Sequence, residues 1–179
     1  MKKITLITFC IFSINLFSQV GIKGGVTYSG LSNLTDPSIS IGTSFGVFTY
    51  LESFRPEINF YQQTYATTLS SSTTNYLNLS ANYAVNITDA ISFVGGLGWD
   101  YWISSSIKIN GTTTKISSSG NALDNLMWNL NLGFAYNISD VLIMDIRYTK
   151  PFANGLLEDI EFNSSIYGTL LTVGYIFGT

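Results

Sequence analysis

One stretch of the chain decides the fold: Asn125-Leu126-Met127-Trp128-Asn129-Leu130-Asn131-Leu132-Gly133-Phe134-Ala135-Tyr136-Asn137-Ile138. From Leu126 onward every second residue is large and apolar, and most residues between them are asparagine, glycine or alanine. Successive side chains of a β-strand point to opposite faces, so this pattern predicts a strand with one apolar and one polar face. The stretch exceeds the usual strand of about five or six residues, and it suits a tilted membrane crossing of about 9–11 residues.

The composition narrows the class of protein. The chain has 179 residues, which suits one domain. Apolar residues make up 46% of it and charged residues only 11%, whereas soluble domains carry about 25% charged residues. Beyond the first residues, no run approaches the roughly 18 consecutive apolar residues of a membrane helix. Two classes remain: a buried β-core, or a barrel whose apolar face meets lipid.

The first residues predict a secretory signal peptide. Lys2 and Lys3 precede a short apolar run over residues 4–12, and the small Ser18 follows at a suitable cleavage point. An N-terminal membrane anchor would need a longer run. We therefore expect residues 1–18 to be a signal peptide cleaved after Ser18, and residues 19–179 to form the exported domain.

The charge of that domain excludes several kinds of site. Without Lys2 and Lys3 it carries six basic and eleven acidic side chains, a net charge of −5. An acidic domain without a basic patch is a poor nucleic-acid binder, so no nucleic-acid partner is expected. The single cysteine, Cys10, lies in the signal peptide, which leaves no disulfide or cysteine metal site in the exported domain. No metal and no cofactor are expected.

Seven further segments alternate as the opening stretch does. Together they predict eight strands, over residues 20–29, 39–51, 54–63, 76–87, 91–103, 125–138, 141–150 and 165–177. The segment 39–51 is the least regular, because the pattern leaves the faces of Phe48 and Tyr50 undecided. The connections alternate between short ones, near residues 51–53, 88–90 and 139–140, and long ones, over residues 30–38, 64–75, 104–124 and 151–164. This asymmetry is typical of outer-membrane barrels, with the short turns in the periplasm.

Charged residues are absent from the middle of the apolar face. Lys150 lies at the edge of a long connection, and the other six within the expected strands all fall on the polar face: Lys23, Arg55, Glu57, Asp100, Asp145 and Arg147. A lysine or arginine facing lipid at the midplane would cost about 2–4 kcal/mol. A soluble lipocalin-like barrel would reverse this parity and point its charges outward. We therefore predict an all-β fold, an eight-stranded antiparallel up-and-down transmembrane β-barrel formed by residues 19–179.

Several short motifs carry a family resemblance. They are Pro56-Glu57 after a short turn, Asp145 and Arg147 in the seventh strand, and the final alternation Leu171, Val173, Tyr175, Phe177. With them the whole exported domain resembles the small eight-stranded outer-membrane barrels. These include OmpA transmembrane-domain-like, OmpX-like and porin-family-like proteins, in the form common in Bacteroidetes as the "outer membrane protein beta-barrel domain". The final alternation resembles the signal read by the barrel assembly machinery, although this chain ends two residues later, at Gly178-Thr179.

Five of the polar-face charges lie in the strand halves nearest the short turns: Lys23, Arg55, Glu57, Asp145 and Arg147. We expect them to meet inside the barrel. Eight strands enclose an interior just wide enough for side chains, and buried charges there must pair. We therefore interpret this network as a structural plug and not as a gate or ion path. Asp100 lies nearer the other end, beside Trp102, and is expected to be solvated.

The sequence does not predict an enzyme. The resemblance includes lipid A palmitoyl-transferases and deacylases, which use a histidine-dependent nucleophile, and this chain contains no histidine. A serine nucleophile would lack its usual base. No catalytic residue is assigned.

Two long connections are candidate external contact loops. In the first, a β-hairpin closed by an Asn-Gly type I′ turn is expected, and its contact residues are Ile107, Lys108, Ile109, Asn110, Gly111 and Lys115. Its exposed edge could pair with a partner strand, or the hairpin could protrude without a partner. In the second, the apolar residues Phe152, Leu156, Leu157 and Phe162 could form a contact patch or cap the barrel mouth.

These observations predict an integral outer-membrane barrel of a Gram-negative bacterium. Its expected role is structural, or binding and adhesion through its external loops, with a lumen plugged by side chains. The alternatives are a small passive pore and an accessory component of an outer-membrane secretion or assembly system. The expected partners are outer-membrane lipid, the barrel assembly machinery during biogenesis, and a protein partner at the extracellular loops.

Overall fold

The computed structural model describes residues 19–31, 40–66, 70–109, 111–117, 126–154 and 166–177. The strands are β1 (Gln19–Leu31), β2 (Ser40–Tyr50), β3 (Phe54–Ala66), β4 (Ser70–Asn86), β5 (Ile91–Ile109), β6 (Thr112–Ser117), β7 (Leu126–Asn137), β8 (Leu142–Asn154) and β9 (Ile166–Phe177). Within these ranges no helix is long and apolar enough to cross a membrane. The predicted signal peptide, residues 1–18, lies outside the described residues.

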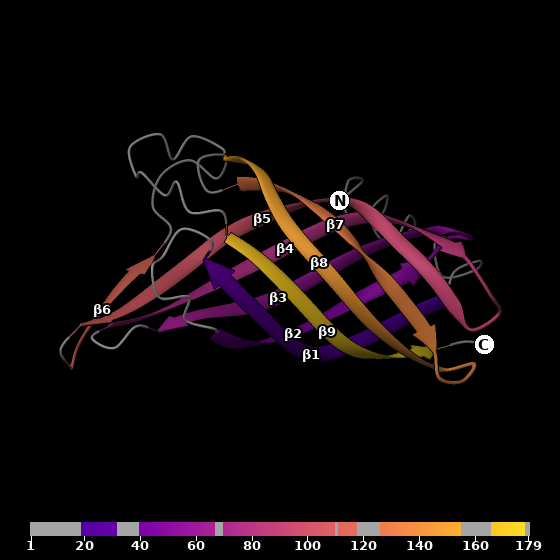
Figure 1. The fold of residues 1–179 in the computed structure, drawn as a ribbon, viewed down its shortest axis with the longest axis horizontal. Coiled ribbons are helices and arrows are strands. Elements are labelled where there is room, and N and C mark those ends of the chain that lie inside the picture. Colours follow the sequence, from indigo (N-terminus) through magenta and orange to yellow (C-terminus); the bar gives the residue numbers. More distant parts are fainter. Residues whose placement is uncertain are drawn as a thin grey trace, which may run out of the picture.

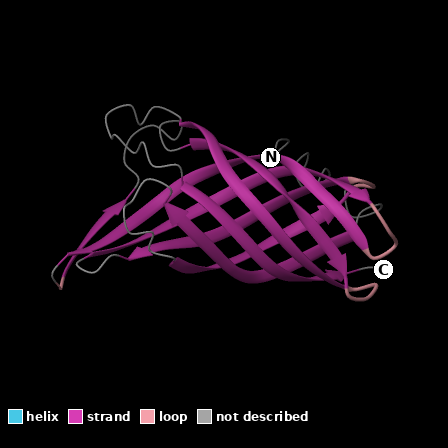
Figure 2. Cartoon of the chain, in the orientation of Figure 1, coloured by secondary structure: helices cyan, strands magenta, loops and turns pink. Residues whose placement is uncertain are grey.

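The strands close into an antiparallel barrel (Figures 1 and 2). The sheet order β4-β3-β2-β1-β9-β8-β7-β5 is closed by pairing between β4 and β5. The short strand β6 pairs with the outer part of β5 and does not join the closed ring. The predicted eight-stranded barrel is thus confirmed, including the irregular segment that becomes β2.

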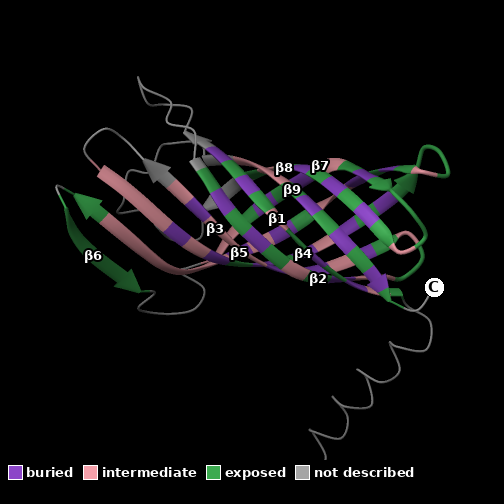
Figure 3. Ribbon diagram, turned by 90° about the horizontal axis from the view of Figure 1, so that it is seen from below, coloured by how far each residue is buried: buried purple, intermediate pink, exposed green. Residues whose placement is uncertain are grey.

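The two sides of the barrel wall differ as the alternation predicts. Buried and exposed residues alternate along the strands in Figure 3. The exposed side carries a continuous band of large apolar side chains, among them Ile41 at 68% exposure, Phe45 at 60% and Tyr83 at 57%. The buried side is mostly polar or charged. Phe48, which the pattern left undecided, faces the interior with an exposure of 2%.

Three short connections, residues 51–53, 87–90 and 138–141, lie at one end of the barrel, which we call the turn end. In the first, Leu51 and Phe54 exchange backbone hydrogen bonds of 2.8 and 3.0 Å, and Glu52 adopts a positive φ of 59°. In the second, the Thr88 hydroxyl accepts a hydrogen bond of 3.0 Å from the Ile91 N–H. We call the opposite end the loop end.

At the loop end two predicted connections are too long, and the predicted hairpin is confirmed. Residues 151–154 were predicted to begin a long connection, but they are the last residues of β8. Residues 64–75 were expected to form a loop, but β3 and β4 continue as a paired ladder, from Gln62 opposite Asn75 to Ala66 opposite Ser71. The expected hairpin is present, since Ile109 pairs with Thr112 across a two-residue turn in which Gly111 has a φ of +86°.

The same region contains a β-bulge. Tyr76 of β4 lies opposite Trp102 of β5, but the preceding Asn75 lies opposite Ser104, so Ile103 is an extra residue. A one-residue insertion exchanges the two faces of the strand beyond it. Below the bulge the odd-numbered residues of β5 face outward, and above it the even-numbered residues do.

Candidate functional site

The barrel interior is filled in layers, beginning with an apolar floor at the turn end. Its members are Phe48, Ala84, Val94, Ala135, Ile143 and Ile176, with Tyr50 packed against them. Gly21 makes room for the largest of these rings, because a Cβ at Gly21 would lie 2.3 Å from the tip of Phe48. The floor was not predicted, since its members occupy the nominally polar face of their strands.

The five charged residues predicted to face the interior form one cluster of ion pairs: Lys23, Arg55, Glu57, Asp145 and Arg147. Their side chains are at most 3% exposed. Glu57 is the centre of the cluster: one carboxylate oxygen lies 2.5 Å from Lys23 Nζ, and the other lies 2.9 Å from Arg55 Nε and 2.7 Å from Arg147 Nη2. Asp145 completes it. Three strands supply these groups: β1, β3 and β8.

Arg55 joins this ionic network to the apolar floor. Its two terminal nitrogens reach both carboxylate oxygens of Asp145, at 3.1 and 2.5 Å, which is the bidentate geometry of a strong ion pair. Its guanidinium carbon lies 4.4 Å from the centre of the Phe48 ring and 5.1 Å from that of Tyr50. The Tyr50 hydroxyl also accepts a hydrogen bond of 3.0 Å from Arg55. One side of the guanidinium therefore faces carboxylates and another faces aromatic rings.

Above the ionic network the interior is lined by amides. Asn59 donates to Glu57 over 3.3 Å and to the Asn78 carbonyl over 3.1 Å, and Asn78 donates to the Asp100 carboxylate over 2.6 Å. A continuous row of hydrogen bonds thus runs from the ionic network toward the loop end. Gly98 leaves space for it, since a Cβ there would lie 3.1 Å from the Asn78 amide nitrogen.

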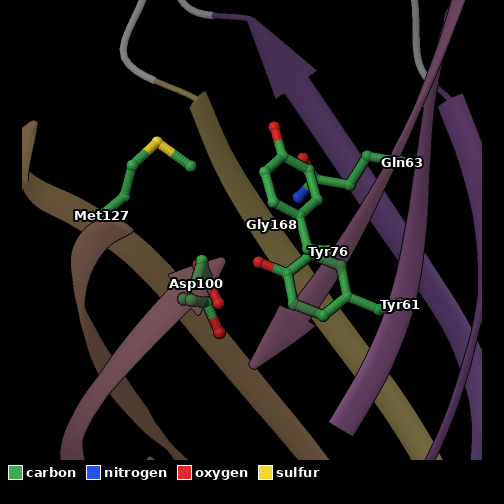
Figure 4. Close-up of a pocket in the computed structure, with 7 residues that line it drawn as sticks. Tyr61, Gln63, Tyr76, Asp100, Met127 and Gly168 are labelled. Atoms are coloured by element: carbon green, nitrogen blue, oxygen red, sulfur yellow. The ribbon is translucent and has the colours of Figure 1, made fainter. Parts of the chain in front are cut away.

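The expectation that Asp100 is solvated is wrong. Its exposure is 1%, because strand parity points it inward, where Asn78 and the Tyr61 hydroxyl hydrogen-bond its carboxylate. Figure 4 shows the Tyr61 hydroxyl directed toward Asp100. Tyr61 also stacks on Tyr76, with ring centres 5.2 Å apart.

A small cavity lies beside Asp100 (Figure 4). Its volume is about 10 Å³, which is room for about one water molecule. It is lined by Tyr61, Gln63, Tyr76, Asp100, Met127, Thr149 and Gly168. Among the described residues no group of acidic, histidine or cysteine side chains could hold a metal ion.

The predicted contact residues are only partly described. Ile107, Lys108 and Ile109 lie on β5, and Gly111 and Lys115 lie in the hairpin turn and on β6. Every residue of β6 is exposed. Phe152 lies within β8, but its side chain lies outside the described part. Asn110, Leu156, Leu157 and Phe162 also lie outside the described residues.

Known proteins share the fold without close similarity of sequence. No protein-family model and no characterised relative matches the sequence. The structure of Neisserial surface protein A superposes with a TM-score of 0.63, at 10% sequence identity, over 88% of this chain and 95% of that one. Ail, the attachment invasion locus protein of Yersinia pestis, gives a TM-score of 0.57 at 14% identity, over 89% of this chain and 99% of that one.

A third similar structure is the N-terminal β-barrel domain of Pseudomonas aeruginosa OprF, with a TM-score of 0.54 at 14% identity, over 89% of this chain and 99% of that one. Ail has also been solved in complex with the heparin analogue sucrose octasulfate. All three resemble this chain over nearly the whole of their own length. The chain therefore has the fold of the small eight-stranded outer-membrane β-barrels.

Proposed function

We propose that this chain is an integral β-barrel of the outer membrane of a Gram-negative bacterium. In this proposal its lumen is closed by its own side chains, and it acts as a structural element or binds partners through its loop end. The observation that carries the proposal is the ionic network above the apolar floor, because together they occupy the path that a solute would take.

The outer surface supports the location in a membrane. Soluble monomers rarely expose apolar patches beyond a few hundred Å², whereas this barrel exposes an apolar band on all its strands. The described exposed charges lie at the edges of this band or beyond it. Glu52, Asp89 and Asp140 are in the turns, and Lys108, Lys115 and Lys150 lie toward the loop end.

The interior supports a closed lumen. Eight strands enclose little more than side-chain volume. Here Phe48 and Ile143 are 2% and 1% exposed, and Arg55 above them is 0% exposed. A permeating ion would have to displace groups that hold one another through five ion pairs. The alternative of a small passive pore needs a continuous aqueous path, so conductance decides between the two.

The test is single-channel conductance of refolded protein in planar bilayers, for the wild type and for Arg55→Ala and Arg147→Ala. Glu52→Gln, in an exposed turn, is the control. We expect a silent wild type and silent control, with conductance in at least one arginine variant. Circular dichroism and the heat-dependent gel mobility of folded barrels establish that each variant is folded. Steady openings of the wild type would reject the closed lumen and favour the pore.

A second candidate function is pairing of β6 with a strand of a protein partner. β6 pairs with β5 along one edge, all six of its residues are exposed, and hairpin edges of this kind accept added strands. A photo-crosslinker at Thr114 in intact cells tests this idea, with the same group at the lipid-facing position Tyr148 as control. A discrete cross-linked protein found only from Thr114 would support it, and would also favour the accessory-component alternative. Identical products from both positions would reject it.

A further inference from the structure

At the loop end, β3, β4, β5 and β6 extend beyond the barrel, and the outward face of this extension carries hydroxyl groups and two lysines. One cross-strand row on this face is Thr64, Thr73, Ser106 and Lys115, which lie opposite one another in turn. Lys108, on the neighbouring row, is the second lysine of the face, and both lysines are exposed. We call these residues, with the adjacent Gln62 and Asn75, the hydroxyl–lysine face.

This face continues the lipid-facing side of the barrel wall. On β3 it follows Ile58 and Phe60 at two-residue steps, and on β4 it follows Leu79 and Leu77. Ile58, Leu79 and Leu77 belong to the exposed apolar band. The hydroxyl–lysine face therefore begins where the apolar band ends, at the level where lipid headgroups meet a membrane protein.

The β5 bulge puts Lys108 on this side. If Ile103 were an ordinary residue of the ladder and not an extra one, the outward positions of β5 would continue through the odd-numbered residues Ile107 and Ile109, and Lys108 would face the lumen axis. With the bulge, Ser104, Ser106 and Lys108 lie outward. Lys115 of β6 lies opposite Ser106, so it shares this side. The same bulge places Ile107 and Ile109 on the opposite face of the sheet.

The polar groups of the face are ordered by one another. Gln62 donates to Asn75 over 3.1 Å, Asn75 donates to Ser104 over 3.1 Å, and the hydroxyls of Thr64 and Thr73 lie 3.3 Å apart. Each amide and hydroxyl has further donor or acceptor capacity beyond these bonds. Such a preorganised row can hydrogen-bond the hydroxyls of a sugar without a large ordering cost.

The positive charge of the two lysines favours an anionic ligand on this face. The exposed acids in the described part of the chain, Glu52, Asp89 and Asp140, are at the turn end, and Asp100 is buried. Neither lysine of the face makes an ion pair with a described residue. A lysine is a compact point charge well suited to phosphate.

We propose that the hydroxyl–lysine face binds the phosphorylated sugar headgroup of a glycolipid in the outer leaflet. Lys108 and Lys115 contact phosphate, and the threonine and amide row contacts the sugar. The inference rests on the proposed membrane location, since only an inserted barrel brings the face to the headgroup level. It adds a lipid of stated chemistry to the partners of the loop end.

The test uses the mature protein refolded into phosphatidylcholine bilayers that contain a small fraction of a phosphorylated glucosamine-disaccharide lipid. Native mass spectrometry counts the glycolipid retained on the extracted barrel, against the dephosphorylated lipid and against phosphatidylcholine alone. We expect retention of the phosphorylated lipid, and a loss of about tenfold or more in affinity for Lys108→Gln with Lys115→Gln, because each lysine supplies a charge-assisted contact. Glu52→Gln, which removes a charge at the turn end, should bind as the wild type does.

A second variant, Ile107→Lys combined with Lys108→Ile, tests the geometry. It moves one lysine to the neighbouring position, opposite Ser72, which faces the other side of the sheet, so retention should fall although the net charge is unchanged. Equal retention by the double lysine variant, or equal binding of the dephosphorylated lipid, would overturn the inference. Lysine-dependent binding of a soluble sulfated polysaccharide, without retention of the glycolipid, would overturn it as well. Gel mobility and circular dichroism in phosphatidylcholine alone report insertion separately, so failure to insert counts against the proposed function.

Discussion

The two halves of the barrel interior are held together by different chemistry. In the turn half, three cations and two carboxylates form five ion pairs above an apolar floor. In the loop half, Asn59, Asn78 and Asp100 are joined by a single file of hydrogen bonds. A buried charge without a partner costs more than a buried amide without one. The comparison teaches that the three buried cations are gathered around one carboxylate, Glu57, whereas the buried Asp100 in the loop half is held by hydrogen bonds from uncharged side chains.

The largest effect should come from the centre of the turn half. Glu57→Gln leaves three cations around a neutral amide, and we expect the free energy of unfolding to fall by about 3–5 kcal/mol. Urea-dependent unfolding and refolding in lipid vesicles measures it. Glu52→Gln, an exposed acid in the turn before β3, is the matched control and should change little. A loss for Glu57→Gln no greater than for that control would remove the distinction between the two halves.

In the loop half, Asn78→Ala should have a smaller effect. It removes the donor to Asp100 and the acceptor of Asn59, which costs about 1–3 kcal/mol for the groups left unpaired. The same unfolding experiment applies, with Ser80→Ala on the same face of β4 for comparison. If Asn78→Ala destabilised the barrel more than Glu57→Gln, the ranking of the two halves would be reversed.

The apolar floor should respond as an ordinary protein core does. Ile143 is 1% exposed and packs with Phe48 and its neighbours. Ile143→Val removes one methylene group and should lower the free energy of unfolding by about 0.5–1.5 kcal/mol. The lipid-facing Ile146→Val is the control, because lipid tails can fill the space that it leaves. Equal losses at the two positions would show that the floor is loosely packed.

The two hairpins with a positive φ give the smallest expected effects. Gly111 has a φ of +86° with open space around its Cα, whereas Glu52 has a φ of 59° with a side chain. Gly111→Ala should destabilise its turn by about 1 kcal/mol, and Glu52→Gly should be neutral or stabilising by a similar amount or less. Hydrogen exchange of the β6 amides reports the first change, and global unfolding reports the second. Faster unfolding of Glu52→Gly would contradict the expected relief at that turn.

Much of the fold could be predicted because lipid imposes a strict alternation. Leu126, Leu130 and Leu132 all had to face the same side, and the charges Arg55 and Asp145 then had to face the other. The ladder over residues 64–75 could not be predicted in this way. Beyond the apolar band neither face meets lipid, so serine and threonine on both sides give no alternation to detect.

The sequence predicts which charged residues line the barrel interior, but it does not predict the apolar floor beneath them. Parity places Glu57 and Arg147 inside, but it does not say that Phe48 and Ile176, also inside, form a separate layer below them. The burial of Asp100 could not be predicted from its place in the sequence, because a position near the loop end suggests contact with water. The depth of Asp100 inside the barrel depends on how far β4 and β5 extend toward the loop end. The polar sequence of those extensions has no alternation from which their length could be predicted.

The ionic network has a consequence for the order in which the protein is built. Its groups come from β1, β3 and β8, and Arg55 and Asp145 are 90 residues apart in the sequence. A chain that has inserted only its first strands holds Lys23, Arg55 and Glu57 without their partners from β8, so each partial barrel carries uncompensated charge. The ionic network is therefore completed only in the last step of biogenesis, when the final hairpin arrives. Unfolding has to separate these paired groups within the buried interior, so the network raises the barrier to unfolding and lengthens the lifetime of the finished barrel.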